Sequence, residues 1–262
     1  MEALIAYSGR RFTRPRYYAN AHERDEVDIA PVPMPVLDGR AAGTGIDREG
    51  FELVLHTSAV RDFHDREEVA RVHMREIEEL VQVRTGADFV HVGAPGLLRF
   101  SERSGLAGSL NNSMPARFAH IDISDATAAQ FATRGADGRP FARCAHYNVW
   151  RALSPAPQDV PLALCDARSL SAGDLIAADA VFDEPGKPEW SFEGLVVAHN
   201  PAHRWHAFLD LNADEAILFK THDSDLARAT HVPHVAFDLP GCPADAPPRV
   251  SIEMRATAWW WH

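Results

Sequence analysis

The fragment His120-Ile121-Asp122 places an imidazole and a carboxylate two residues apart in an apolar run. Side chains on a β-strand alternate between its two faces, so both groups point to the same side. They supply two corners of a two-histidine, one-carboxylate site, which leaves coordination positions open on Fe(II). A histidine and an aspartate at this spacing also form ordinary hydrogen-bonded pairs, so the prediction of a metal site depends on a third ligand.

The third ligand is expected on a later strand, far along the chain. His234 lies 114 residues after His120 and opens the apolar run 234–237 (HVAF). We therefore predict that His234 completes the ligand set, with His231 as the competing candidate and His222 as a more distant one. The alternative for His234 is a histidine at a strand edge whose ring bonds only to the backbone.

Arg249 and Ser251 lie two residues apart at the start of the last apolar run, 249–261. A guanidinium group beside a hydroxyl matches a single carboxylate well. The pair would therefore suit the distal carboxylate of a dicarboxylic cosubstrate such as 2-oxoglutarate. The alternative is an exposed ladder of ion pairs on an edge strand, formed by Arg249, Glu253 and Arg255.

Asn148 and Arg151 lie on the β-rich run that follows the His-x-Asp fragment. Asn148 could face a pocket and bond to the cosubstrate or the substrate. Arg151 has the opposite parity, so on a regular strand it faces the other side, unless a bulge intervenes. Its alternative role is a structural ion pair with Asp166 or Asp174.

Three strings between these fragments carry a family resemblance: 148–151 (NVWR), 162–169 (LALCDARS) and 200–205 (NPAHRW). With the order His-x-Asp, distant His and Arg-x-Ser, they resemble the Fe(II)/2-oxoglutarate-dependent oxygenases. The similar group includes the cephamycin 7α-hydroxylase component, the AsaB-type hydroxylase/desaturases and the fungal meroterpenoid endoperoxidase. The resemblance runs from about Gly50 to Ala258, although Ile123-Ser124 stands where many of these relatives have Tyr-Thr.

The resemblance implies a double-stranded β-helix (jelly-roll) core and a nonheme iron oxygenase. Fe(II) would be held by His120, Asp122 and His234, which are the predicted catalytic residues. The implied cosubstrates are 2-oxoglutarate and dioxygen, and the substrate would be a small natural product or an amino-acid derivative. Hydroxylation, desaturation and cyclisation all remain open. The residues expected to bind the cosubstrate or the substrate are Arg249, Ser251, Asn148 and Arg151.

The elements that position these residues are mostly short strands. Ten β-rich runs follow residue 88, each bounded by turn residues, which predicts a sandwich or barrel. One amphipathic helix is expected between a cap at Asp65 and a stop at Gly86, and a short helical insertion at 124–133. We expect one domain, 1–262, with an irregular, proline-rich N-terminal part at 1–98 that holds the amphipathic helix. The jelly-roll core is expected at 99–262.

Composition narrows the class of protein further. The 262 residues carry a formal net charge of −11, which would repel phosphate backbones and disfavours nucleic acid as a partner. The three cysteines show no CxxC spacing, and no apolar run is long enough to span a membrane. These features favour a cytoplasmic protein with a small-molecule substrate, and leave a homodimer or a partner protein open.

Two other functions compete with the oxygenase. A cupin-like metalloenzyme could use the same three ligands with another metal, and it would not need Arg249 or Ser251. A noncatalytic partner protein could retain the fold without binding iron.

Overall fold

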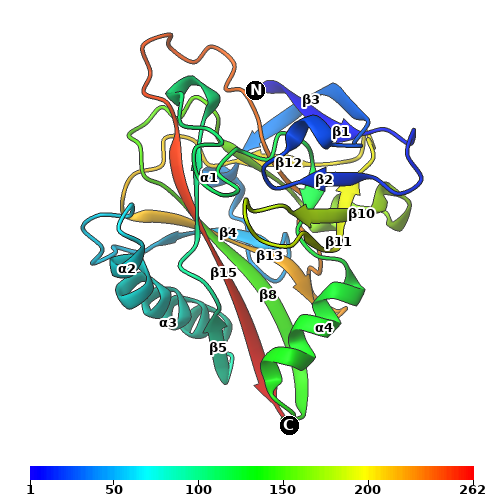
Figure 1. Cartoon of the computed structure of the whole chain (residues 1–262), viewed down its shortest axis with the longest axis vertical. Coiled ribbons are helices and arrows are strands. Elements are labelled where there is room, and N and C mark those ends of the chain that lie inside the picture. The colour runs from blue at the N-terminus through cyan, green and yellow to red at the C-terminus, as the bar shows by residue number, and fades with distance from the viewer.

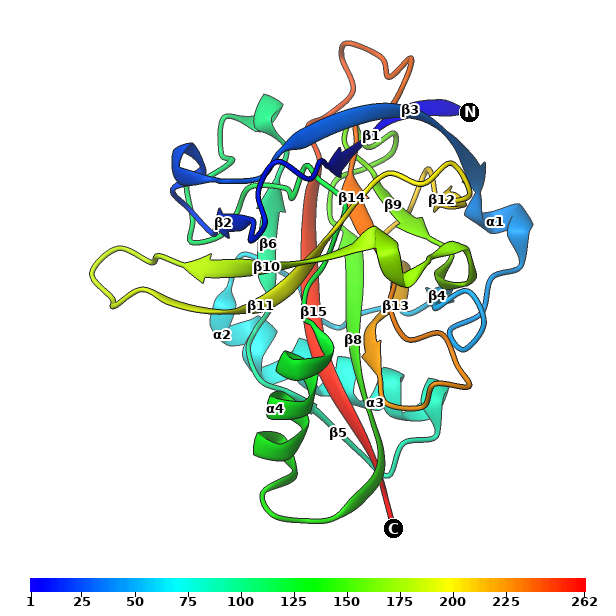
Figure 2. The same ribbon diagram turned by 90° about the vertical axis from the view of Figure 1, so that its right-hand side faces the viewer.

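Two facing β-sheets form the framework of the structure, a computed structural model that describes residues 1–262 (Figure 1, Figure 2). The nine-stranded sheet has the order β1 (Glu2–Ser8), β3 (Ile29–Asp38), β12 (Trp205–Ala207), β9 (Leu162–Cys165), β14 (His234–Ala236), β7 (His120–Ile121), β11 (Trp190–Val197), β10 (Leu175–Phe182) and β2 (Arg16–Tyr18). The six-stranded sheet has the order β4 (Phe51–Leu55), β13 (Glu215–Asp223), β8 (Phe141–Ala152), β15 (Val250–Trp261) and β5 (Phe89–Val92), with β6 (Leu97–Phe100) also beside β15. The predicted mainly-β, jelly-roll class is confirmed.

The predicted amphipathic helix is confirmed and packs on the outer face of the six-stranded sheet. It consists of α2 (Arg66–Glu68), a π-helical stretch η2 (Val69–His73) and α3 (Met74–Thr85). The Asp65 carboxylate accepts hydrogen bonds from the backbone N–H groups of Glu67 and Glu68, and Gly86 ends the helix at φ +68°. Its apolar side contributes Val69, Ile77 and Val81 to the core.

A second helix, α4 (Asp125–Ala136), occupies the predicted insertion. The Ser124 hydroxyl accepts from the backbone N–H of Thr127 and caps it. The indole N–H of Trp259 donates to the Ala132 carbonyl at 3.2 Å, so the tryptophan-rich end of β15 packs under this helix. The remaining helical segments are α1 (Gly39–Ala42) and the 3-10 turns η1 (His22–Arg24), η3 (Glu102–Ser104), η4 (Ala167–Ser169) and η5 (Ala172–Asp174).

We expected the N-terminal part, residues 1–98, to be irregular. It is regular instead, because it supplies strands to both sheets. The three prolines Pro31, Pro33 and Pro35 lie inside the ten-residue strand β3, where the turn residues predicted irregular surface chain with short strands. The backbone nitrogens of these prolines all point to the edge of β3 that faces away from β1. The N–H groups of the even-numbered residues point toward β1, and the N–H of Val36 donates to the Met1 carbonyl. On the proline side β3 has no partner until β12 begins at Val36, so the missing N–H groups cost no ladder bonds.

The side chains of β15 alternate between the hydrophobic core and the space between the two sheets. Ile252 and Met254 belong to the core cluster that includes α3, so Ser251, Glu253 and Arg255 turn to the opposite face, toward the nine-stranded sheet. Both edges of β15 are paired, with β8 on one side and β5 and β6 on the other. The alternative of an exposed ion-pair ladder on an edge strand is therefore wrong.

Candidate active site

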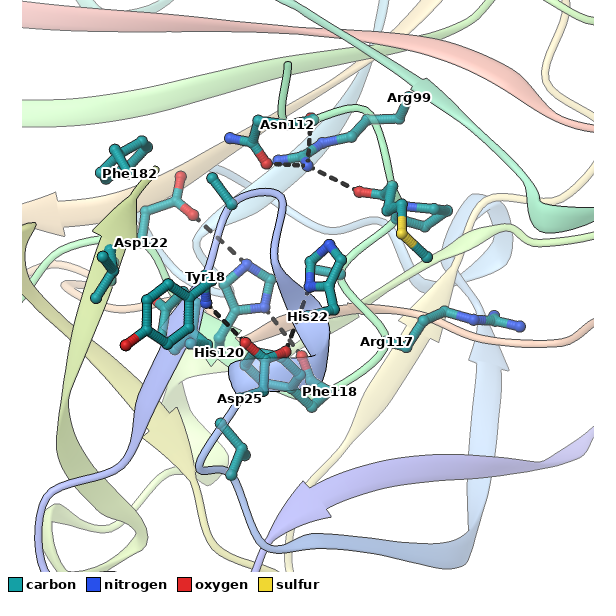
Figure 3. A pocket seen from close by; sticks show the side chains of 18 of the residues that line it. Tyr18, His22, Asp25, Arg99, Asn112, Arg117, Phe118, His120, Asp122 and Phe182 are labelled. Carbon is teal, nitrogen blue, oxygen red and sulfur yellow. Dashed lines mark hydrogen bonds and ion pairs between the residues drawn. The ribbon is translucent and has the colours of Figure 1, made fainter. Parts of the chain in front are cut away.

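The His120, Asp122 and His234 side chains meet between the sheets. His120 and His234 are direct partners across the antiparallel pair β7–β14, so their rings lie on the same face with centroids 4.2 Å apart. One carboxylate oxygen, Oδ1 of Asp122, lies 3.5 Å from His120 Nε2 and 3.6 Å from His234 Nε2. All three side chains are buried, and Figure 3 shows His120 and Asp122 turned toward each other.

Backbone carbonyls fix the orientation of both imidazoles. His120 Nδ1 donates to the Phe118 carbonyl at 2.9 Å, and His234 Nδ1 donates to the Val232 carbonyl at 3.2 Å. In each case the acceptor lies two residues before the histidine. The proton is thereby held on Nδ1, and the Nε2 lone pairs of both rings point at the same space as the Asp122 carboxylate. This orientation by outer partners is typical of metal-ligating histidines.

Asp122 receives two further contacts from the opposite sheet. The side-chain amide of Asn148 donates to its Oδ2 at 2.9 Å, and the Arg255 guanidinium lies 3.2 Å from the same oxygen. Burial opposes the carboxylate charge, but Arg255 and the two imidazoles hold the pKa of Asp122 well below its ordinary value. Asp122 is therefore ionised at neutral pH, as a metal ligand must be.

Arg249 lies beyond the two histidines in a small cavity that it shares with His120, His234 and Trp150. Its guanidinium is buried and donates one hydrogen bond, from Nη1 to the Val160 carbonyl at 2.7 Å, while Nε has no partner. Burial and the nearby charges of Arg99 and Arg117 lower the pKa of Arg249 to about 9. The guanidinium thus remains charged at neutral pH without an acidic partner.

Ser251 follows on the same face of β15, and its buried hydroxyl has no hydrogen-bond partner. A buried polar group without a partner is costly unless a ligand satisfies it. The orphaned atoms of Arg249 and Ser251 therefore fit a bound carboxylate.

Arg151 is not brought to this group of residues. Strand β8 has no bulge between Asn148 and Arg151, and its regular alternation turns the Arg151 side chain away from the triad. The buried guanidinium donates to the carbonyls of His56 and Ala213, and lies 2.6 Å from His56 Nδ1. Neither Asp166 nor Asp174 is its partner, so the ion pair that we weighed as its alternative is absent as well.

A larger cavity of about 300 Å³ opens on the other side of the triad (Figure 3). His120 and Asp122 form part of its wall, next to Arg99 and Arg255. The aromatic lining of the cavity comes from the N-terminal segment, the loop before β7 and the β10–β11 hairpin. The aromatic residues are Tyr17, Tyr18, Phe118, Phe182 and Phe192. Sequence reasoning missed these residues, because only the arginine- and tyrosine-rich composition of 10–18 distinguishes the N-terminal segment.

Comparisons with known proteins identify the family of this chain. The profile of the Oxidoreductase/YMDC permease-like domain family matches residues 8–259. The alpha-ketoglutarate-dependent dioxygenase phiK of Fungal sp. (strain ATCC 74256) is 30% identical over 248 residues, which cover 89% of this chain and 85% of phiK. This chain belongs to the Fe(II)/2-oxoglutarate-dependent hydroxylase/desaturase family. It is a 2-oxoglutarate-dependent dioxygenase of the hydroxylase/desaturase type.

Other members of the family are similar over most of the chain. The hydroxylase/desaturase efuI of Hormonema carpetanum is 28% identical over 257 residues, 90% of this chain and 86% of efuI. The iron and alpha-ketoglutarate-dependent endoperoxidase NvfI has the same fold, with a TM-score of 0.81 at 20% identity over 100% of this chain and 98% of NvfI. No helix is long and apolar enough to cross a bilayer. The cytoplasmic location and the oligomeric state stay predictions.

Proposed function

We propose that this dioxygenase holds Fe(II) through His120, Asp122 and His234 and uses it to hydroxylate, desaturate or cyclise a small natural product. The observation that carries the proposal is the convergence of two oriented Nε2 lone pairs and one ionised carboxylate at a buried point between two cavities. Such a donor set leaves one side of a bound ion free for other ligands.

Arg249 and Ser251 are proposed to bind the distal carboxylate of 2-oxoglutarate. The buried guanidinium of Arg249 would form a charge-assisted hydrogen bond with the carboxylate, and the Ser251 hydroxyl would donate a second hydrogen bond. Arg249 and both histidines line one small cavity, so a cosubstrate anchored at Arg249 would extend its 2-oxo acid end toward the iron ligands.

The larger aromatic cavity is proposed as the substrate site. The mostly apolar lining favours a substrate with extended hydrocarbon surface, which would displace water from the reacting C–H bond when bound. Iron, dioxygen and 2-oxoglutarate together supply the oxidising power when bound. The residues of the chain bind, orient and enclose the reactants, with Asn148 and Arg255 fixing the carboxylate of Asp122.

The deciding experiment is an anaerobic titration of the metal-free protein with Fe(II), followed by 2-oxoglutarate. We expect a weak visible charge-transfer band from the iron chelate in the wild-type protein, and none in His120→Ala. If iron binds but no band develops, the cosubstrate assignment fails and the non-oxygenase metalloenzyme is favoured. If Fe(II) does not bind at all, the noncatalytic alternative gains support.

A further inference from the structure

A second group of metal-ligating side chains lies close to the first. It comprises Asp125, the first residue of α4, with His222 from the end of β13 and His231 from the loop before β14. The ligand atoms of the three residues all lie within 4.8 Å of one another. His231 Nε2 lies 3.1 Å from Asp125 Oδ1, and His222 Nε2 lies 3.4 Å from the same oxygen.

Hydrogen bonds within the protein do not account for the approach of the two imidazoles to this oxygen. His231 Nε2 is shielded from solvent, and its contact with Asp125 lacks hydrogen-bond geometry. His222 also turns its Nε2 toward this oxygen, at 3.4 Å. Buried imidazole nitrogens are normally hydrogen-bonded, so the unpartnered Nε2 of His231 points to a missing ligand.

The surroundings supply neutral nitrogen donors and one negative charge. Burial lowers the pKa of both His222 and His231, so both rings are uncharged at neutral pH. The neighbouring ring of His146 is committed elsewhere, because its nitrogens contact the Thr257 hydroxyl and the Ala128 carbonyl. Two neutral imidazoles and a carboxylate are a donor set suited to a borderline divalent ion such as Zn²⁺.

We propose that Asp125, His222 and His231 form a second binding site for a divalent transition metal, distinct from the iron triad. Asp125 lies three residues after Asp122, and His231 lies three residues before His234. A metal held here would join the start of α4 to the loop that leads into β14, and so tie together the two segments that carry triad residues. The Asp125 side chain is 81% exposed, so the ion would have access from solvent.

Cobalt(II) is the probe for this site, because its visible absorption reports coordination by nitrogen and oxygen ligands. Metal-free protein is titrated with Co²⁺ in the wild type, Asp125→Asn, His222→Ala and His120→Ala, with His91→Ala as the control for loss of an exposed histidine. We expect two equivalents in the wild type and in His91→Ala, and one in each of the other three variants. The double variant His120→Ala/Asp125→Asn is expected to bind none.

A stability readout separates metal binding from a folding defect. At saturating Co²⁺, occupation of the second site is expected to raise the Tm of His120→Ala by about 5 °C, and to leave the Tm of the double variant unchanged. Because Asp125 is exposed, Asp125→Asn keeps the fold intact. The proposal is overturned if Asp125→Asn and His222→Ala both take up as much metal as the wild type, or if His120→Ala abolishes all uptake. Unchanged uptake in His120→Ala alone would count against the iron triad instead.

Discussion

At the scale of the residue, Arg249 is a buried cation that the protein leaves without an acidic partner. Replacing it with alanine removes the charge-assisted contact proposed for 2-oxoglutarate, which is worth about 2–3 kcal/mol. We expect the half-saturating concentration of 2-oxoglutarate to rise by roughly 30- to 150-fold, with Fe(II) binding retained. Steady-state assays of succinate release measure the change.

The matched variant for this test is Ser251→Ala, which removes only the weaker neutral hydrogen bond. Its effect on the 2-oxoglutarate requirement is expected to be about tenfold or less. An unchanged requirement in Arg249→Ala would remove this arginine from the cosubstrate site.

Asn148 acts through Asp122, to which its amide donates at 2.9 Å. The Asn148→Ala variant leaves the carboxylate less firmly oriented, so Fe(II) affinity is expected to fall by about 10- to 100-fold. Equilibrium dialysis under anaerobic conditions measures this. Asn200→Ala serves as the control, because Asn200 bonds to Asp174 and not to the triad. Unaltered affinity in Asn148→Ala would show that this amide has no positioning role.

At the scale of the element, the helical segment 66–85 depends on the cap at Asp65. Its carboxylate satisfies two backbone N–H groups, so Asp65→Ala is expected to lower the free energy of unfolding by about 1 kcal/mol. Urea denaturation followed by circular dichroism measures the loss. Asp65→Asn keeps an acceptor at the cap and should be close to the wild type. Equal stabilities of the alanine and wild-type proteins would contradict the role of the cap.

Local geometry made several features of this protein predictable. Strand alternation predicts the shared face of His120 and Asp122 and the opposite parity of Asn148 and Arg151. Capping and helical spacing predict the helix that begins after Asp65. Strand β3 was not predictable in the same way, because its prolines are tolerated only where one side of the strand lacks a partner.

Contacts between the sheets also lay beyond sequence reasoning. Arg255 was considered only as part of a surface ladder, yet it reaches Asp122 across the interior. Tyr17 lines the large cavity because β2 pairs with β10, a pairing between segments more than 150 residues apart. Such pairings are decided by the packing of the whole chain, and no local pattern encodes them.

At the scale of the whole molecule, buried histidines make stability sensitive to mild acid. Burial lowers the pKa of His73 and of His146 to about 4, from an ordinary value of 6.5. Between these values the unfolded chain binds protons that the folded chain does not, so stability falls as the pH falls from 6.5 toward 4. Each of the two histidines is expected to cost about 2 kcal/mol between pH 7 and pH 5.

Urea midpoints measured at pH 7, 6 and 5 test this prediction. His146→Gln can still bond to Thr257 and Ala128 but does not titrate, so its stability should fall less steeply with acid than that of the wild type. A wild-type midpoint that is constant over this range would refute the prediction. Carboxylates with lowered pKa values begin to lose their contribution only near pH 5, at the acid end of the interval tested.

The direct pairing of β7 with β14 has a consequence for the order in which the protein matures. His120 and His234 become neighbours only when strands separated by 114 residues have docked side by side. Contacts of such long range form late, because the entropy of closing the intervening loop must first be overcome. During synthesis on the ribosome, the proposed ligand set is incomplete until residue 234 has emerged. A partly synthesised chain would therefore hold Fe(II) through two of the three proposed ligands at most.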